Sequence, residues 1–433
     1  MYLTDIHIKN IRSISELKWE IAPNKEAGWH VIIGDNGSGK SSFLRSIALA
    51  LVGPSEAAAL RQDWRKWLRA GESSGTIRLH LTYHKSLDKF ADGKRAVLGP
   101  LSLTVELIKG AHQIELLGSG GKTRPNHHVW GGKSGWFSAS YGPYRRFTGG
   151  NESYETIFLS QPRLASHLSV FDESVALTET VRWLQDLQFK KLEKQREGAL
   201  LDSLKGFINQ KEFLPHQAQL QEVSSRGIEF VDGNGCPVAV EELSDGYRSI
   251  LSMTFELIRQ LARTYGPDHV FDENDPTKVI APGVVLIDEV DVHLHPTWQR
   301  RVGLWFREHF PNLQFIVTTH SPLVCQAAEA GTVFRLPKPG SDESGGMVSG
   351  VDLDRLLYGN VLDAYGTELF GEDITRSEQS KKLLQRLAEL NRKELHGQLS
   401  RAERDEQKRL RASLPTSAHT LNNLDEGATD KAS

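Results

Sequence analysis

Residues 34–41, GDNGSGKS, have the residue types and the spacing of a loop that binds phosphate. Backbone N–H groups of a Gly-rich turn can surround phosphate oxygens, and the N-terminus of a following helix adds partial positive charge. In this pattern Lys40 would reach the β- and γ-phosphates of a nucleotide, and the Ser41 hydroxyl would bind Mg²⁺. The predicted nucleotide-binding residues are Gly34, Asn36, Gly37, Gly39, Lys40, Ser41 and Ser42.

The segments on either side of this loop support the prediction. An apolar strand at residues 31–33 enters it, and residues 41–52 predict an amphipathic helix that leaves it. A second Gly-rich segment, GSGGKT at 118–123, lacks this context, because Leu116 stands where the first glycine is needed and Pro125 follows closely. We interpret the second segment as a flexible loop.

Two adjacent acids follow a strongly apolar strand predicted at residues 283–288. In folds with a phosphate loop, the end of such a strand lies beside that loop. There Asp288 would hold Mg²⁺ through water, and Glu289 would polarise the attacking water as a general base. The next predicted strand, 314–320, ends at His320, which could reach and sense a γ-phosphate at the tip of a neighbouring parallel strand.

The segment ELSDGYRSIL at 242–251 precedes the acidic strand and opens a helix. It resembles the signature of ABC-type ATPases, usually Leu-Ser-Gly-Gly, with Ser244 and Gly246 matching and Asp245 in place of the first glycine. The order of phosphate loop, signature, acids and His320 is that of an ABC-type ATPase. The Asp form, the HLHP after the acids and the TTHSP ending resemble compact RecF/OLD-like ATPases of the AAA family. Many of these belong to bacterial antiphage systems, including Septu and retron-associated systems.

This resemblance covers about residues 1–335 and implies a mechanism. In ABC-type ATPases the signature of one subunit closes on the nucleotide bound to the other. Ser244 and Gly246 would then cap a γ-phosphate in trans, and two ATP molecules would hold two heads together. The cofactors that the resemblance implies are ATP and Mg²⁺. Asp291 stands where such proteins have a D-loop. Gln161 is the predicted Q-loop glutamine and metal contact, and residues 138–147 are a rival segment.

The predicted fold is α/β, an ABC-type ATPase head with a phosphate-loop parallel sheet, an antiparallel β subdomain and a helical lobe that carries the signature. Alternating helix and strand from about residue 245 favour the parallel sheet, and residues 77–84, 101–108 and 112–117 favour the antiparallel strands. The predicted domains are the head at 1–345, with its helical lobe at about 165–260, a helical extension at 346–412 and a disordered tail at 413–433.

Composition narrows the class of protein. With 52 Lys and Arg against 55 Asp and Glu, no chain-wide basic field points to nucleic acid. Cys236 and Cys325 stand far apart, outside any CxxC spacing, which suits a reducing cytosol. We find neither an apolar run long enough to cross a membrane nor a secretion signal, so the predicted location is cytoplasmic.

Several segments leave alternatives open. His293 and His295 could bind a metal, although packing in a loop is the simpler interpretation. Arg145-Arg146 could touch phosphate or could be surface charge at the end of a strand. Residues 376–412, with 11 Lys and Arg against 6 Asp and Glu and a leucine stripe, could pack on the core, dock a partner or face nucleic acid.

The favoured role is the sensor and regulator ATPase of an antiphage complex, with a separate effector such as a nuclease and with self-association through ATP. Three alternatives come from other classes: a RecF-like ATPase of DNA repair, a nucleotide-binding subunit of a transporter and a stand-alone nuclease. DNA-stimulated turnover, copurification with a membrane subunit and metal-dependent cleavage would distinguish them.

Overall fold

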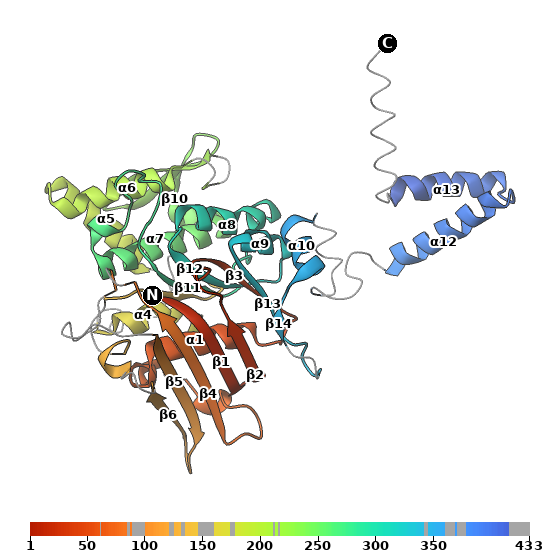
Figure 1. Ribbon diagram of the computed structural model, residues 1–433. Coiled ribbons are helices and arrows are strands. Elements are labelled where there is room, and N and C mark those ends of the chain that lie inside the picture. The colour runs from red at the N-terminus through yellow and green to blue at the C-terminus, as the bar shows by residue number, and fades with distance from the viewer. Residues whose placement is uncertain are drawn as a thin grey trace. The chain divides into compact units, whose positions relative to one another are not determined.

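The computed structural model describes residues 1–60, 62–84, 87–88, 100–120, 125–130, 135–145, 160–173, 178–210, 213–214, 217–341, 345–359, 369 and 378–414. The chain divides into two compact units, Met1–Phe370 and Gly371–Ser433 (Figure 1). Gly118 and Ser119 of the Gly-rich segment, predicted to be a flexible loop, lie in a strand, Ile114–Ser119. Residues 121–123 of that segment and nearly all of the predicted disordered tail lie outside the described residues. The first unit extends past the boundary predicted at residue 345, because Leu356 of α10 (Gly350–Tyr358) packs in its core.

A six-stranded sheet forms the centre of the first unit, in the order β14-β13-β3-β12-β11-β7. Five strands run parallel, and the edge strand β14 (Gly346–Met347) is antiparallel. The parallel strands are β3 (Gly28–Ile33), β7 (Ser138–Tyr141), β11 (Gly283–Ile287), β12 (Leu313–Thr318) and β13 (Gly331–Arg335). The predicted parallel sheet is therefore confirmed, and its carboxyl ends gather at one edge.

A five-stranded antiparallel sheet, in the order β2-β1-β4-β5-β6, confirms the predicted β subdomain (Figure 1). Its strands are β1 (Tyr2–Ile11), β2 (Ile14–Glu20), β4 (Ser74–Thr82), β5 (Leu101–Lys109) and β6 (Ile114–Ser119). Helix α1 (Lys40–Val52) packs between the two sheets in one apolar core. Alternate residues of β3 divide between layers: Ile32 belongs to this core, and Val31 belongs to the core on the opposite face.

The opposite face of the parallel sheet is covered by helices and a small β hairpin. The helices are α5 (Thr178–Leu192), α6 (Ala199–Ile208), α7 (Asp245–Tyr265) and α8 (Pro296–His309). The strands β8 (Gln219–Ser224), β9 (Gly227–Val231) and β10 (Pro237–Ala239) form a second antiparallel sheet. Phe207 packs edge-on against Trp305 and Phe310, so aromatic contacts join α6 to α8.

The second unit contains a helical hairpin, α12 (Glu378–Leu395) and α13 (Arg401–Ser413). Gly397, at φ 68°, lies in the turn between the two helices, in the backbone region that favours glycine. Leu387 and Leu390 of the predicted stripe are buried, whereas Leu383 is 38% exposed. Cross-helix ion pairs such as Arg386–Glu406 neutralise part of the predicted basic charge.

Both cysteines are free thiols: Cys236 is exposed, and Cys325 is buried in the core. Among the described residues, no single helix is long and apolar enough to cross a membrane. The bent pair Lys40–Val52 and Pro54–Leu60 passes that test on length and composition alone, and its first helix lies in the core between the sheets.

Candidate active site

The phosphate loop connects β3 to α1 at the carboxyl edge of the parallel sheet. Gly37 and Gly39 adopt the left-handed backbone region, with φ of 82° and 102°. A Cβ atom on Gly39 would lie 2.6 Å from Ser13 Oγ, so both conformation and space require glycine there. The predicted strand, loop and helix are confirmed. Asn36 and Gly37 are exposed at the tip of the loop, and Ser41 and Ser42 are half-buried in the first turn of α1.

Lys40 is held inside this loop. Its Nζ donates hydrogen bonds to the carbonyl oxygens of Gly34 at 2.7 Å and Asp35 at 3.0 Å. Burial lowers the pKa of Lys40, and the negative charges of Glu289 and Asp288 oppose that shift. The acids after β11, two strands away from β3 in the sheet, therefore act electrostatically on the lysine, as the prediction of a shared phosphate site requires.

Asp288 and Glu289 directly follow β11 at the same edge. Thr318, the last residue of β12, donates from Oγ1 to Asp288 Oδ1 at 2.6 Å, and its hydroxyl oxygen accepts from the Glu289 N–H at 2.8 Å. Glu289 has a φ of 48°, which is unusual for a residue with a side chain. Burial, and then the charges of Asp288 and Asp291, raise the pKa of Glu289. A carboxylate with a raised pKa suits a general base.

Arg145 lies behind these acids, and sequence reasoning gave it no such role. Only 6% of Arg145 is exposed, which contradicts its interpretation as surface charge at the end of a strand. Its guanidinium makes hydrogen bonds to protein atoms, including Ser249 Oγ. Its guanidinium donates to the carbonyls of Gly142, Asp288 and Glu289 at 3.0–3.1 Å. Burial lowers the pKa of Arg145 to about 10. Arg146, its neighbour in the prediction, lies outside the described residues.

His320 follows β12 by two residues and is exposed at the same edge. Protein atoms that shield part of the ring from water, and then the charge of Lys40, lower the pKa of His320, so the imidazole is neutral at pH 7. Nearby, Thr319 Oγ1 donates to Asp291 Oδ1 at 2.6 Å and fixes the predicted D-loop residue against β12. The structure thus brings His320 and Asp291 to the carboxyl edge with the loop and the acids.

The signature segment forms the start of α7, where Ser244 is the exposed N-cap residue and its side chain makes no capping hydrogen bond. A Cβ atom on Gly246 would lie 2.8 Å from the carbonyl oxygen of His293, so the segment packs closely on the chain after the acids. A cavity of about 110 Å³ lies here, lined by Ser244, Gly246 and several apolar side chains. His293 and His295 line it too, and His295 caps α8 by accepting from the Thr297 N–H.

A family model described as an AAA domain matches residues 5–232, more than half of the chain, and a second AAA-domain model matches residues 159–326. The chain belongs to the AAA-domain ATPase family. Its relatives include the Septu protein PtuA of Bacillus mycoides strain KBAB4, which is 26% identical over 335 residues. That match covers 77% of this chain and 40% of the relative.

Two further relatives of this AAA-domain chain match over shorter segments. A retron Ec83 probable ATPase of Escherichia coli is 35% identical over 32% of this chain and 23% of its own length. The DNA replication and repair protein RecF of Clostridium botulinum strain ATCC 19397 is 28% identical over 28% of this chain and 30% of its own length. Among solved structures, an SmcHead bound to the C-winged helix domain of ScpA is 17% identical, with a TM-score of 0.49, over 81% of this chain and 98% of its own.

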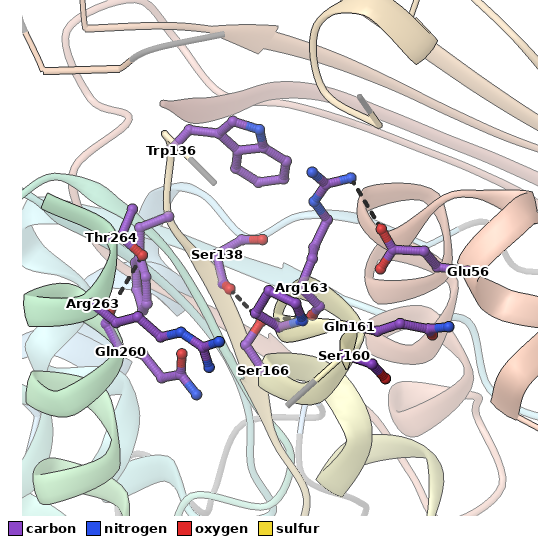
Figure 2. A pocket seen from close by; sticks show the side chains of 12 residues that line it. Glu56, Trp136, Ser138, Ser160, Gln161, Arg163, Ser166, Gln260, Arg263 and Thr264 are labelled. Carbon is purple, nitrogen blue, oxygen red and sulfur yellow. Dashed lines mark hydrogen bonds and ion pairs between the residues drawn. The ribbon is translucent and has the colours of Figure 1, made fainter. Parts of the chain in front are cut away.

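The structure does not bring Gln161 to the carboxyl edge of the parallel sheet, where Lys40 and the two acids lie. Gln161 precedes α4 (Pro162–Phe171), which runs in the same direction as β7: Ser166 Oγ donates to the carbonyl of Ser138, the first residue of that strand, and Ser169 Oγ donates to the carbonyl of Ser140. Gln161 therefore lies at the amino edge of the sheet, where it lines a cavity of about 170 Å³ (Figure 2). In Figure 2 the same cavity shows Arg163 paired with Glu56.

The described part of the rival segment, residues 138–145, does reach the carboxyl edge, because Tyr141 at the end of β7 pairs with Ile287 of β11. Gln161 was predicted to lie at the nucleotide only from its place in the sequence between the phosphate loop and the signature. Because α4 runs in the same direction as β7, the first turn of the helix lies at the opposite, amino edge of the sheet.

The residues at the carboxyl edge fit a nucleotide with Mg²⁺. Ser38 Oγ is buried and has no hydrogen-bond partner among the residues that the structure describes, so the loop keeps a donor available for phosphate. Ser41 offers a hydroxyl and Asp288 a carboxylate, the hard oxygen ligands that Mg²⁺ prefers alongside phosphate and water. No cluster of three or more His, Cys, Asp or Glu that could hold a metal by itself occurs among the described residues.

Proposed function

We propose that this chain hydrolyses ATP with Mg²⁺ in a head dimer that closes around two nucleotides. The observation that carries the proposal is the carboxyl edge itself, where the charges of Asp288 and Glu289 act on Lys40 across the strands of one parallel sheet. A lysine in a Gly-rich loop and a following pair of acids are the parts that phosphoryl transfer in this class requires.

The roles of the residues follow from their positions. Lys40 would exchange its two loop carbonyls for β- and γ-phosphate oxygens, and Ser41 and Asp288 would hold Mg²⁺, which neutralises charge that develops on the phosphates. Glu289 would accept a proton from the attacking water, because its raised pKa makes it a stronger base than an ordinary Glu. His320 would contact the γ-phosphate as a neutral imidazole.

Self-association would complete the site. Ser244 is exposed at the N-terminus of a 21-residue helix, where backbone N–H groups and the helix dipole favour an anion. In a head dimer this terminus would cap the γ-phosphate bound by the other copy. Asp291, held by Thr319, would lie close to the seam between the copies.

We further propose a cytoplasmic role as the sensor and regulator ATPase of an antiphage defence complex, in which the state of the nucleotide controls a separate effector such as a nuclease. The similarity to the Septu protein PtuA and to the retron Ec83 probable ATPase supports this role. The chain spans less than half the length of either relative, so their partners and output are part of the proposal.

A native pull-down of the tagged chain, with quantitative mass spectrometry, tests the defence role. We expect a nuclease or toxin-like protein in fixed ratio with the chain. A Lys40→Ala variant serves as the matched bait, since loss of the partner from that bait alone would show that the nucleotide controls the complex. A chain that is recovered alone contradicts the defence role.

The second candidate is a RecF-like ATPase of DNA repair, which the similarity to RecF favours. It predicts that double-stranded DNA alone stimulates turnover by the purified chain. Recovery with replication and repair proteins in the same pull-down would support this candidate over the defence role.

A further inference from the structure

Arg145 connects the signature helix to both acids of the active site. Its Nε donates to Ser249 Oγ at 2.9 Å, and Ser249 lies in α7, one turn after Gly246. Its Nη1 donates to the Asp288 carbonyl at 3.0 Å, and its Nη2 donates to the Glu289 carbonyl at 3.1 Å. One planar guanidinium therefore fixes α7 relative to the end of β11.

The geometry makes this connection stiff. A guanidinium presents its donors in a fixed fork, so a shift of one acceptor rotates the whole group and disturbs the others. Both Arg145 and Ser249 are buried, with 6% and 2% of their surface exposed, so water does not readily replace a lost contact. Movement at the start of α7 would therefore reach the backbone of the acids.

The backbone of Glu289 is the sensitive end of the connection. Its φ of 48° is held by three contacts: the N–H donates to Thr318 Oγ1, and the carbonyl accepts from Arg145 and from the Val292 N–H. If Arg145 rotates, the Glu289 peptide can turn, and the carboxylate on the same residue changes direction. A general base must keep its direction to within a small angle, so this contact can control the rate of hydrolysis.

We propose that Arg145 is a positioning residue that couples the two nucleotide sites of the dimer. When Ser244 of one copy caps the nucleotide of the other, α7 would shift Arg145 and set Glu289 for hydrolysis in the first copy. Each site would thus report the occupancy of its neighbour through a single side chain. This inference rests on the proposed two-site ATPase, and Arg145 itself does not touch the nucleotide.

The test compares Ser249→Ala with Ser252→Ala in the full chain. Ser249→Ala removes only the acceptor for Arg145 Nε. Ser252 is a matched control, because it is a buried serine one turn further along α7, and its hydroxyl donates to the Ser249 carbonyl. We measure turnover as a function of ATP concentration, the binding of a fluorescent ATP analogue and the thermal unfolding temperature.

For Ser249→Ala we expect turnover to fall about tenfold and the Hill coefficient to fall toward the non-cooperative value, with the affinity for the analogue within about twofold. Ser252→Ala should keep both turnover and cooperativity. Arg145→Lys, which keeps the charge but loses the fork, should behave like Ser249→Ala.

Three outcomes would overturn the coupling role. A Ser249→Ala variant that loses thermal stability but keeps its turnover and Hill coefficient shows a purely structural contact. A wild-type chain that hydrolyses ATP without cooperativity overturns the coupling and leaves the ATPase assignment intact. A wild-type chain without ATP turnover overturns the proposed function and the coupling together.

Discussion

Thr318 and Asp288 are joined by a buried hydrogen bond of 2.6 Å, from Thr318 Oγ1 to Asp288 Oδ1. The same hydroxyl oxygen accepts from the Glu289 N–H at 2.8 Å. Thr318 ends β12, and Asp288 follows the neighbouring parallel strand β11. The side chain of one acid and the backbone of the next are therefore oriented by a hydroxyl from another strand.

Replacing Thr318 with valine tests this support. Thr318→Val keeps the side-chain shape but leaves a buried Asp288 oxygen without its donor, which costs about 1–3 kcal/mol of the free energy of unfolding. We expect turnover to fall about 10- to 100-fold, because the carboxylate that would hold Mg²⁺ loses its orientation. Thr318→Ser, which keeps the hydroxyl, is the control. Equal turnover in both variants would contradict the role of the hydroxyl.

Glu289→Gln should separate nucleotide binding from hydrolysis. The amide keeps the size of the side chain but cannot accept a proton from water, so we expect turnover to fall by about 10²- to 10⁴-fold. ATP should then hold the dimer together, which light scattering after gel filtration would detect. Glu308→Gln, the same change at an exposed position of α8, is the control. Wild-type turnover by Glu289→Gln would show that another group is the base.

The activity should fall on the acid side at a higher pH than an ordinary Glu would give. The pKa of Glu289 is raised by burial and by the charges of Asp288 and Asp291. A base works only when deprotonated, so turnover is lost as the pH falls through this raised pKa. Asp291→Asn removes one negative charge while an oxygen remains to accept from Thr319. We expect the acid limb of the pH–rate profile to move to lower pH, and an unmoved limb would contradict this electrostatic link.

Lys40→Ala should weaken nucleotide binding itself. The variant loses the one side-chain ammonium of the phosphate loop, and charge-assisted hydrogen bonds of this kind correspond to an affinity loss of about 10- to 100-fold. Titration with a fluorescent ATP analogue measures it. Lys18→Ala is the control, since the Lys18 side chain is 64% exposed on β2. Unchanged affinity in Lys40→Ala would place the nucleotide elsewhere.

The predictable part of the site comes from contiguous residues. A phosphate loop consists of one short segment between a strand and a helix, so residues 34–41 carry the whole pattern. Asp288 and Glu289 follow an apolar strand, and the carboxyl ends of parallel strands meet at one edge. These local rules place Lys40, the acids and His320 together without knowledge of the three-dimensional structure.

The parts that escaped prediction depend on distant contacts. Arg145 meets Ser249 across 104 positions and Asp288 across 143, and no local pattern marks a buried arginine. The YGP turn at residues 141–143 was the available sequence signal for Arg145, because this turn follows a strand that could join the same sheet as the acids. Gln161 was misplaced for a related reason: its position in the chain says nothing about the direction in which α4 runs.

Gly246→Ala should separate dimerisation from nucleotide binding. The new Cβ would lie 2.8 Å from the His293 carbonyl oxygen, and this backbone atom cannot yield without moving the start of α7 or the segment after the acids. Either movement displaces Ser244 from the surface that would cap the nucleotide of the other copy, while the Lys40 loop is untouched. In a Glu289→Gln background we expect the ATP-dependent dimer to be lost, with the analogue affinity within about twofold.

Gly206→Ala is the control for this change, because Gly206 is exposed in α6 and a Cβ atom there meets nothing within 4 Å. That substitution should leave the dimer intact and raise the free energy of unfolding by about 0.5–1 kcal/mol, the usual gain of alanine over glycine in a helix. An ATP-dependent dimer that forms equally well with Gly246→Ala would show that the signature segment is not the surface through which two copies meet.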